Sequence, residues 1–178
     1  GGVHQGAETS FDISADLHEL ATSPVNVVAA GAKAILDIPK TLEVLETLGV
    51  PVIAYGQDEF PAFWSRESGL KAPLRLDDPA AIARSFRVRR ALGLPGGQLI
   101  GNPVPPEAEI ARAQMAPVIS DATAEAARQG ITGKAVTPFL LGHILTLTQG
   151  RSLATNINLV RNNARLAAAI ACALGQSA

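Results

Sequence analysis

Short apolar runs alternate with segments of helical periodicity along the first part of the chain. Three of the runs have the length of strands buried in a parallel sheet: residues 25–30, 50–55 and 98–101. Between the first two, leucines recur at three-residue spacing from Leu42 to Leu48, which predicts a helix that Gly49 ends. Strand, helix and strand with short connections predict a right-handed parallel crossover.

Caps and helix breakers predict the remaining helices. They are expected over residues 15–21, 78–93, 107–129, 137–147 and 152–173. Ser14 and Ser152 are the expected caps of the first and the last of them. Residues 57–73 hold most of the aromatic side chains and are expected to pack as a lid or a subunit contact. This order of elements predicts a three-layer α/β domain.

Lys33 follows the first apolar run, in Val27-Val28-Ala29-Ala30-Gly31-Ala32-Lys33. Gly31 allows a tight turn out of the sheet, which places the lysine at the carboxyl edge, where open α/β folds collect ligands. Partial desolvation there would favour a neutral, nucleophilic amine. The alternative is a lysine that extends from a strand end into solvent.

The stretch from His4 to Asp16 is dense in side chains that bind ligands. Asp12 and Asp16 offer hard oxygen donors, which suit Mg²⁺ or Mn²⁺. Ser14, followed by exposed helix N–H groups, is a candidate phosphate site, or it only caps its helix. His4 is a candidate for binding substrate or transferring a proton, or it is a structural histidine.

Asparagines lie on the predicted last helix. Asn156 and Asn163 are seven residues apart and share a face. Buried amides need partners, which would be substrate groups or the backbone of a neighbouring helix. Four arginines between residues 84 and 90 have no interleaved aromatic side chains, which favours a solvated face over a nucleic-acid site.

Composition narrows the class of protein. The 178 residues are enough for one domain with a core, and 47% hydrophobic with 17% charged residues is typical of a soluble globular protein. A net charge of −1 gives no reason to expect nucleic acid, and no apolar run is long enough to span a bilayer. The single cysteine, Cys172, fits a reducing, cytoplasmic setting. The opening Gly1-Gly2-Val3-His4, without Met or a cleavable leader, predicts a piece of a longer protein.

Two motifs carry a family resemblance. They are His4-x-Gly6-Ala7-Glu8…Phe11-Asp12-Ile13-Ser14-Ala15-Asp16 and Val27-Val28-x-Ala30-Gly31-Ala32-Lys33. Both resemble the pseudouridine-5′-phosphate glycosidase family. Later runs agree in order, among them Thr137-Pro138-Phe139 and Ser152-Leu153-x-x-Asn156, so the resemblance spans essentially the whole chain.

The resemblance implies a fold and an activity. Residues 1–178 are expected to form a single domain, the C-terminal part of a three-layer α/β/α glycosidase domain with a mostly parallel sheet flanked by helices. Family members are lyases that reversibly convert pseudouridine 5′-phosphate to uracil and ribose 5-phosphate in pyrimidine salvage. They use Mn²⁺ and form homotrimers. The implied partner is this small-molecule substrate, with no nucleic acid and no membrane.

Site residues are carried over by motif. Lys33 matches the lysine that forms a Schiff base, and Asp12 matches the metal ligand. Ser14, Ala15 and Asp16 match a segment that contacts substrate, while His4 and Asn156 match residues that line the uracil and ribose pocket.

The chain also departs from the family pattern. The family's cysteine before the lysine is Ala29 here. The glutamate proton donor and a further substrate lysine of the family have no counterpart in this chain. Two alternatives therefore stay open: a catalytically incomplete fragment that binds only metal or a partner chain, and a Schiff-base lyase that acts on another sugar phosphate.

Overall fold

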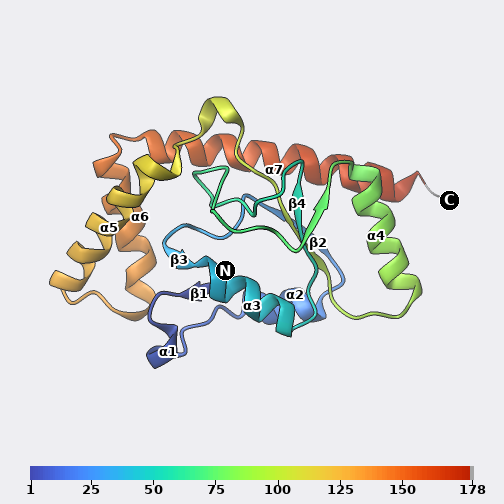
Figure 1. Ribbon diagram of the computed structural model, residues 1–178, viewed down its shortest axis with the longest axis horizontal. Helices are drawn as coiled ribbons and strands as arrows, with labels where there is room; N and C mark the ends of the chain where they lie inside the picture. The colour runs from blue at the N-terminus through green and yellow to red at the C-terminus, as the bar shows by residue number, and fades with distance from the viewer. Residues whose placement is uncertain (177–178) are drawn as a thin grey trace.

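A parallel sheet runs through the middle of the molecule, between two layers of helices (Figure 1). The computed structural model describes residues 1–176, the side chain of Lys134 excepted, so positions 177 and 178 of the predicted domain lie outside the described residues. The sheet has the order β2-β6-β4-β5 and consists of β2 (Asn26–Ala29), β4 (Val52–Tyr55), β5 (Leu74–Leu76) and β6 (Gln98–Gly101). The expected α/β/α class with a mostly parallel sheet is confirmed, whereas the single domain over residues 1–178 stays a prediction.

Different helices cover the two faces of the sheet. One face is covered by α2 (Asp16–Thr22) and α3 (Ile38–Thr47), and the other by α4 (Pro79–Ala91) and α7 (Arg151–Gly175). Side chains alternate between the faces along a strand. In β6, Leu99 accordingly packs in the cluster of α2 and α3, while Ile100 packs with residues of α4 and α7.

A helical pair lies beside the sheet and extends the same core. It consists of α5 (Arg112–Arg128) and α6 (Val136–Leu147), which follow the 3-10 turns η1 (Pro106–Ala108) and η2 (Gly133–Ala135). The helix expected from residue 107 begins only at Arg112. The chain before it is held in another conformation, because the Ile110 N–H donates to the Trp64 carbonyl at 3.0 Å.

Two of the predicted helix caps are wrong. Helix α2 begins one residue late, after Ala15, although the Ser14 hydroxyl still accepts a hydrogen bond from the Asp16 N–H at 3.3 Å. Helix α7 begins after Gly150, whose φ of 84° only glycine adopts easily. Ser152 lies buried inside this helix, and its carbonyl accepts a hydrogen bond from Trp64 Nε1 at 3.2 Å.

Residues 57–73 do not form a lid. Phe60 and Trp64 are 0% and 2% exposed, so their rings are part of the main core. The prediction of a lid is therefore wrong for this segment. Aromatic side chains far from a strand or helix pattern still bury large apolar areas, and here they fill the space between the sheet and the helical pair.

The crossover between β2 and β4 is parallel as expected, but β6 lies between the two strands. The run at residues 25–30 does not form a fully buried strand, because β2 is an outer strand and all four of its residues are only partly buried. The sequence pattern also missed β5 and the short strands β1 (Val3–His4) and β3 (Leu36–Asp37). None of the helices within residues 1–176, including the 25 residues of α7, is long and apolar enough to cross a membrane.

Candidate active site

The first residues of the chain lie between two other segments. Strand β1 pairs antiparallel with β3, with His4 opposite Leu36. On the other side of β1, the His4 N–H donates to the Asp12 carbonyl at 3.0 Å, and the Ser14 N–H donates to the Gly2 carbonyl at 3.0 Å. The backbone thus brings His4, Asp12 and Ser14 beside the segment that contains Lys33.

Lys33 lies in the connection between β2 and β3 and is half-buried. The Leu36 N–H donates to the Lys33 carbonyl at 2.8 Å, which closes a turn. Because Leu36 is the residue paired with His4, the backbones of His4 and Lys33 run in neighbouring segments. The part of the chain that the structure describes places no carboxylate in an ion pair with the Lys33 amine.

Gly31 fixes the path of the chain into this turn. Its φ is 86°, and a Cβ built on it would lie 1.7 Å from the Pro61 carbonyl oxygen. Only glycine can adopt this backbone at so close an approach. The expectation that Gly31 provides a tight turn out of the sheet is confirmed.

His4 and Asp12 form the candidate metal site. His4 Nδ1 lies 3.8 Å from Asp12 Oδ2, and both side chains are partly exposed. Within residues 1–176, no group of three or more His, Cys, Asp or Glu side chains could hold a metal ion. The pair nevertheless fits a cation such as Mn²⁺ that accepts oxygen and imidazole donors, provided that water supplies the remaining ligands.

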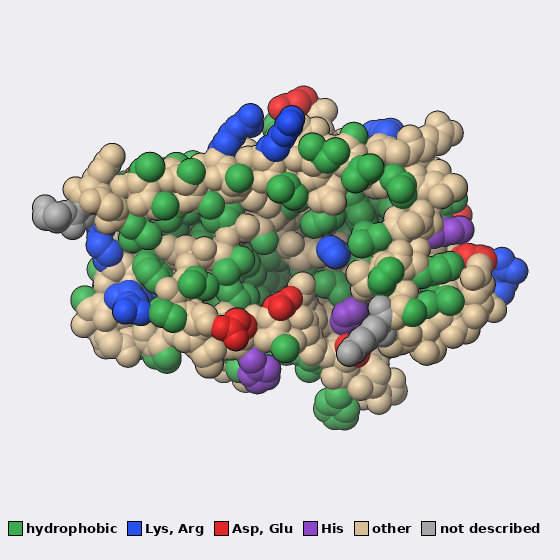
Figure 2. All heavy atoms as spheres, turned by 180° about the vertical axis from the view of Figure 1, so that it is seen from behind, with side chains coloured by type: hydrophobic (Ala, Val, Ile, Leu, Met, Phe, Trp, Pro, Cys, Tyr) green, Lys and Arg blue, Asp and Glu red, His purple; other side chains and the backbone are tan. Residues whose placement is uncertain are grey.

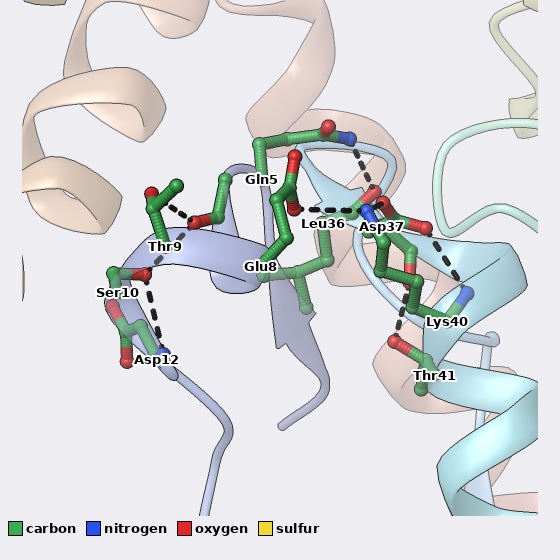
Figure 3. A network of polar contacts seen from close by, with 10 residues as sticks. Gln5, Glu8, Thr9, Ser10, Asp12, Leu36, Asp37, Lys40 and Thr41 are labelled. Carbon is green, nitrogen blue, oxygen red and sulfur yellow. Dashed lines mark hydrogen bonds and ion pairs between the residues drawn. The ribbon is translucent and has the colours of Figure 1, made fainter.

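An ion-pair network joins Glu8 to the beginning of α3 (Figure 3). The Lys40 ammonium contacts Asp37 Oδ2 at 2.7 Å and Glu8 Oε2 at 3.1 Å. The hydrogen bond from the Lys40 ammonium lowers the pKa of Asp37. In return, the hydrogen bond to Asp37 is the largest cause of the raised pKa of Lys40, and the hydrogen bond to Glu8 is the next largest. A backbone hydrogen bond and then Lys40 lower the pKa of Glu8. Sequence reasoning left this network out, although the i, i+3 spacing of Asp37 and Lys40 is a signal for it.

Ser14, Ala15 and Asp16 lie at the start of α2. Ser14 is half-buried, whereas Ala15 and Asp16 are exposed. Asp16 lines an open cavity of about 340 Å³. Of the three, only Asp16 lines this cavity.

The residues on either side of Lys33 in the sequence line two different cavities. Gly31 and Ala32 line the cavity of about 340 Å³ that Asp16 also lines. Ala34 and Leu36 line a second cavity of about 420 Å³, to which Arg112 contributes its side chain. Lys33 itself is not among the residues that line either of these two cavities.

Asn156 approaches this region from α7. It is half-buried, and Leu159, one turn further along, packs in a cluster with Ala30 and Val104. The Asn156 side chain makes no hydrogen bond to any other residue that the structure describes. Helix α7 packs against β2, the strand that leads to Lys33, and no hydrogen bond or ion pair among the described residues joins Asn156 to His4 or Lys33.

The other asparagines of this region have structural partners. Asn162 Nδ2 donates to the Pro103 carbonyl at 3.1 Å. Asn163 Oδ1 accepts from Asn102 Nδ2 at 3.1 Å. Both tie α7 to the loop after β6, so their partners are loop residues rather than the expected backbone of a neighbouring helix.

These features define an α/β/α protein that presents a lysine beyond the carboxyl end of a parallel strand, beside a histidine and an aspartate. Residues 1–173 match the family model of the indigoidine synthase A like protein, and the chain belongs to this family. It is 76% identical over 174 residues to the pseudouridine-5′-phosphate glycosidase of Paracoccus denitrificans and 67% identical to that of Roseobacter denitrificans. The resemblance stated from the motifs is confirmed.

Solved structures agree with this assignment. The prealnumycin C-glycosynthase AlnA, in complex with ribulose 5-phosphate, has a TM-score of 0.91 and 34% identity over 98% of this chain and 57% of its own. An indigoidine synthase A-like protein from Thermotoga maritima has a TM-score of 0.85 and 36% identity over 96% of this chain and 56% of its own. The match to the Paracoccus denitrificans relative covers 98% of this chain but only 57% of the relative, so the chain spans little more than half the length of that protein.

Proposed function

We propose that the chain is the lysine-bearing part of a pseudouridine-5′-phosphate glycosidase. The whole enzyme reversibly cleaves the C–C glycosidic bond of pseudouridine 5′-phosphate to uracil and ribose 5-phosphate, in pseudouridine degradation. The 76% identity to a relative of that name supports the reaction. The pentose phosphate bound to the neighbour AlnA supports the class of substrate.

The observation that carries the proposal is the contrast between two lysines. Lys40 is held by Asp37 and Glu8, and a raised pKa keeps its amine protonated. Lys33 is half-buried, lies three residues before the partner of His4 in the β1–β3 pair, and has no ion pair within the described residues. An amine held by two carboxylates is not free to approach a substrate carbon, so the absence of an ion pair supports Lys33 over Lys40 as the residue that forms a Schiff base.

The chemistry explains why an amine is needed. A carbanion of uracil is too unstable to leave directly from carbon. The Lys33 amine forms a bond to C1′ of the ribose while the ring oxygen leaves and takes a proton. The bond from C1′ to uracil C5 then breaks as the nitrogen lone pair forms an iminium, and C5 takes a proton. Water adds to the iminium and expels the amine, which releases ribose 5-phosphate.

Other residues of the chain take binding roles in this proposal. His4 and Asn156 line the pocket of uracil and ribose, and Ser14, Ala15 and Asp16 contact the substrate. Asp12, with His4 close by, would hold Mn²⁺, which orders water and polarises uracil carbonyls when it is bound. The acid that protonates C5 belongs to the part of the enzyme that the chain does not span. The whole protein is proposed to act in the cytoplasm as a homotrimer.

The test uses a chimera, here called the completed protein. It is the Paracoccus denitrificans relative with its matching segment replaced by this chain. Treatment with ribose 5-phosphate and borohydride should trap a stable adduct that mass spectrometry locates at Lys33. Lys33→Ala should abolish both the adduct and the release of uracil, while Lys71→Ala, at an exposed position, should change neither.

The outcomes separate the alternatives. An adduct and uracil release in the completed protein support the proposal. An adduct that forms on the chain alone without uracil release identifies it as a catalytically incomplete fragment. Turnover restricted to other phosphosugars, or near-normal activity of Lys33→Ala, contradicts the assignment.

A further inference from the structure

A side chain of α3 joins this helix to the short strand β1. Val3 of β1 pairs with Asp37 at the end of β3. The Val3 N–H donates to the Thr41 hydroxyl at 2.9 Å, and the hydroxyl donates to the Asp37 carbonyl at 2.7 Å (Figure 3). A hydroxyl that accepts from an N–H and donates to a carbonyl has one orientation that satisfies both groups. Thr41 therefore bridges the two paired residues from the side of the helix.

The surroundings of Thr41 are mostly apolar. The residue is 2% exposed and lines the cavity of about 340 Å³ together with Leu17, Leu20, Leu45 and Leu99. Viewed from behind, the molecule is hollowed between its upper and lower helices, and hydrophobic side chains line the hollow (Figure 2). A hydrogen bond in apolar surroundings is stronger than in water, and a group there that loses its partner is destabilised more. The bond from the Val3 N–H to Thr41 is therefore an effective anchor for β1.

The chain around Val3 lies directly against α3. A Cβ built on Gly2 would lie 3.1 Å from Thr41 Oγ1 and 2.8 Å from Leu36 Cδ1. Non-bonded carbon atoms pack at about 3.5–4.0 Å. A methyl group in place of the Thr41 hydroxyl could therefore not approach the Val3 nitrogen to the 2.9 Å of the hydrogen bond. The hydroxyl thus sets the distance between β1 and α3.

The position of His4 depends on this distance, because β1 consists only of Val3 and His4. On one side, His4 is opposite Leu36, whose N–H donates to the Lys33 carbonyl at 2.8 Å. On the other side, the His4 N–H donates to the Asp12 carbonyl at 3.0 Å. A movement of Val3 therefore changes the place of His4 relative to both Asp12 and the turn that contains Lys33.

We propose that Thr41 is a positioning residue, whose hydroxyl holds His4 at the candidate metal site and beside the turn of Lys33. Thr41 acts through Val3 rather than by contact with a ligand. The inference rests on the proposed function, in which Asp12, with His4 close by, holds Mn²⁺. It adds a residue of α3 to the site residues that the sequence motifs identified.

Hydrogen exchange in the completed protein tests the anchor without any catalytic readout. Thr41→Val places a methyl group against the Val3 N–H, whereas Thr41→Ser keeps the hydroxyl. We expect the His4 amide to exchange at least about 10-fold faster in Thr41→Val, because its bond to Asp12 opens more often, and within about 2-fold of the parent rate in Thr41→Ser. Equal exchange of the His4 amide in the two variants overturns the inference. Should Thr41→Val not fold, Thr41→Ala replaces it with the same expectation, since it also removes the hydroxyl.

The binding of Mn²⁺ separates positioning from a purely structural role. We expect the dissociation constant, measured by the electron paramagnetic resonance of free Mn²⁺, to rise about 10-fold in Thr41→Val and to return to the parent value in Thr41→Ser. Thr148→Val is the matched control. The Thr148 hydroxyl also accepts a backbone N–H, from Ser152 at 3.2 Å, and donates to the Ile144 carbonyl four residues earlier at 2.7 Å, but it joins α6 to α7. Thr148→Val should lower the melting temperature and leave the exchange of His4 and the affinity for Mn²⁺ unchanged.

The outcomes distinguish this inference from the proposed function. If Thr41→Val lowers the melting temperature and leaves Mn²⁺ binding intact while Asp12→Asn weakens it, the metal site stands and the inference is overturned. If Asp12→Asn also leaves the binding intact, the metal assignment of the proposed function is wrong, and the exchange of the His4 amide alone decides the inference. Neither readout uses a Schiff base, so a wrong assignment of Lys33 changes neither result.

Discussion

His4 Nδ1 lies 3.8 Å from Asp12 Oδ2, and the backbone beneath the two side chains is fixed by a 3.0 Å hydrogen bond from the His4 N–H to the Asp12 carbonyl. The same short strand is clamped from the other side, where the Thr41 hydroxyl accepts the Val3 N–H at 2.9 Å. An imidazole and a carboxylate are thus held close by main-chain contacts rather than by the direct contact between the two side chains, which is long and partly exposed. This arrangement makes the pair suitable as a preformed ligand site.

Gly31→Ala should destabilise the completed protein strongly. An alanine there combines a φ of 86° with a Cβ placed 1.7 Å from the Pro61 carbonyl oxygen, so the chain between β2 and β3 must move. We expect a loss of about 3 kcal/mol or more in the free energy of unfolding, measured by urea titration.

Gly49→Ala is the matched control for Gly31→Ala. Gly49 has a similar φ of 69°, but its Cβ would meet nothing within 4 Å. The expected loss is about 1 kcal/mol, from backbone conformation alone. If both substitutions have the same small effect, the close approach of Pro61 does not constrain the turn before Lys33.

Phe60→Ala should lower stability rather than alter substrate access. The ring is fully buried in the main core, and its removal leaves a cavity, which typically reduces the free energy of unfolding by about 3–5 kcal/mol. Phe11, which is 82% exposed, provides the control, and Phe11→Ala should stay within about 0.5 kcal/mol. A Phe60→Ala protein with normal stability and altered KM would restore the lid that the sequence suggested.

The strands and helices with strong periodicity were predictable, as was the turn at Gly31. The sequence could not predict how deeply each element is buried or which segments pack against it. The run at residues 25–30 is typical of a fully buried strand, yet β2 is an outer strand of the sheet and its residues are only partly buried. Phe60 and Trp64 belong to no periodic pattern, and only the three-dimensional packing reveals that they are buried. Likewise, the closeness of His4 to the Lys33 segment depends on the pairing of two-residue strands too short for any sequence signal.

Asp37→Asn should destabilise the completed protein only within a defined pH range. Lys40 lowers the pKa of Asp37, so the carboxylate contributes stability above its unfolded pKa of about 4, and this is lost as pH falls through the lowered folded value. Lys40 has a raised pKa, so its contribution is lost as pH rises through that value. Asparagine still caps α3, since it accepts the Lys40 N–H as well as aspartate does.

The measurement is the melting temperature of Asp37→Asn against that of the parent protein as a function of pH. A difference of a few degrees at pH 7 should vanish in strong acid. Asp78→Asn is the control, because Asp78 also caps a helix with proline in its first turn but has no ion pair among the described residues. A pH dependence shared by both variants would show that the cap, and not Lys40, is responsible.

Asp12→Asn should weaken the binding of Mn²⁺ to the completed protein. An amide lacks the charge of the carboxylate, and Asp12 is the acidic ligand that the candidate site offers beside His4. We expect the dissociation constant, measured by the electron paramagnetic resonance of free Mn²⁺, to rise at least about 10-fold. Asp121→Asn, at an exposed position on α5, should leave it unchanged. Because titration of the metal needs no substrate, unaltered binding in Asp12→Asn would place the ion elsewhere whether or not Lys33 forms a Schiff base.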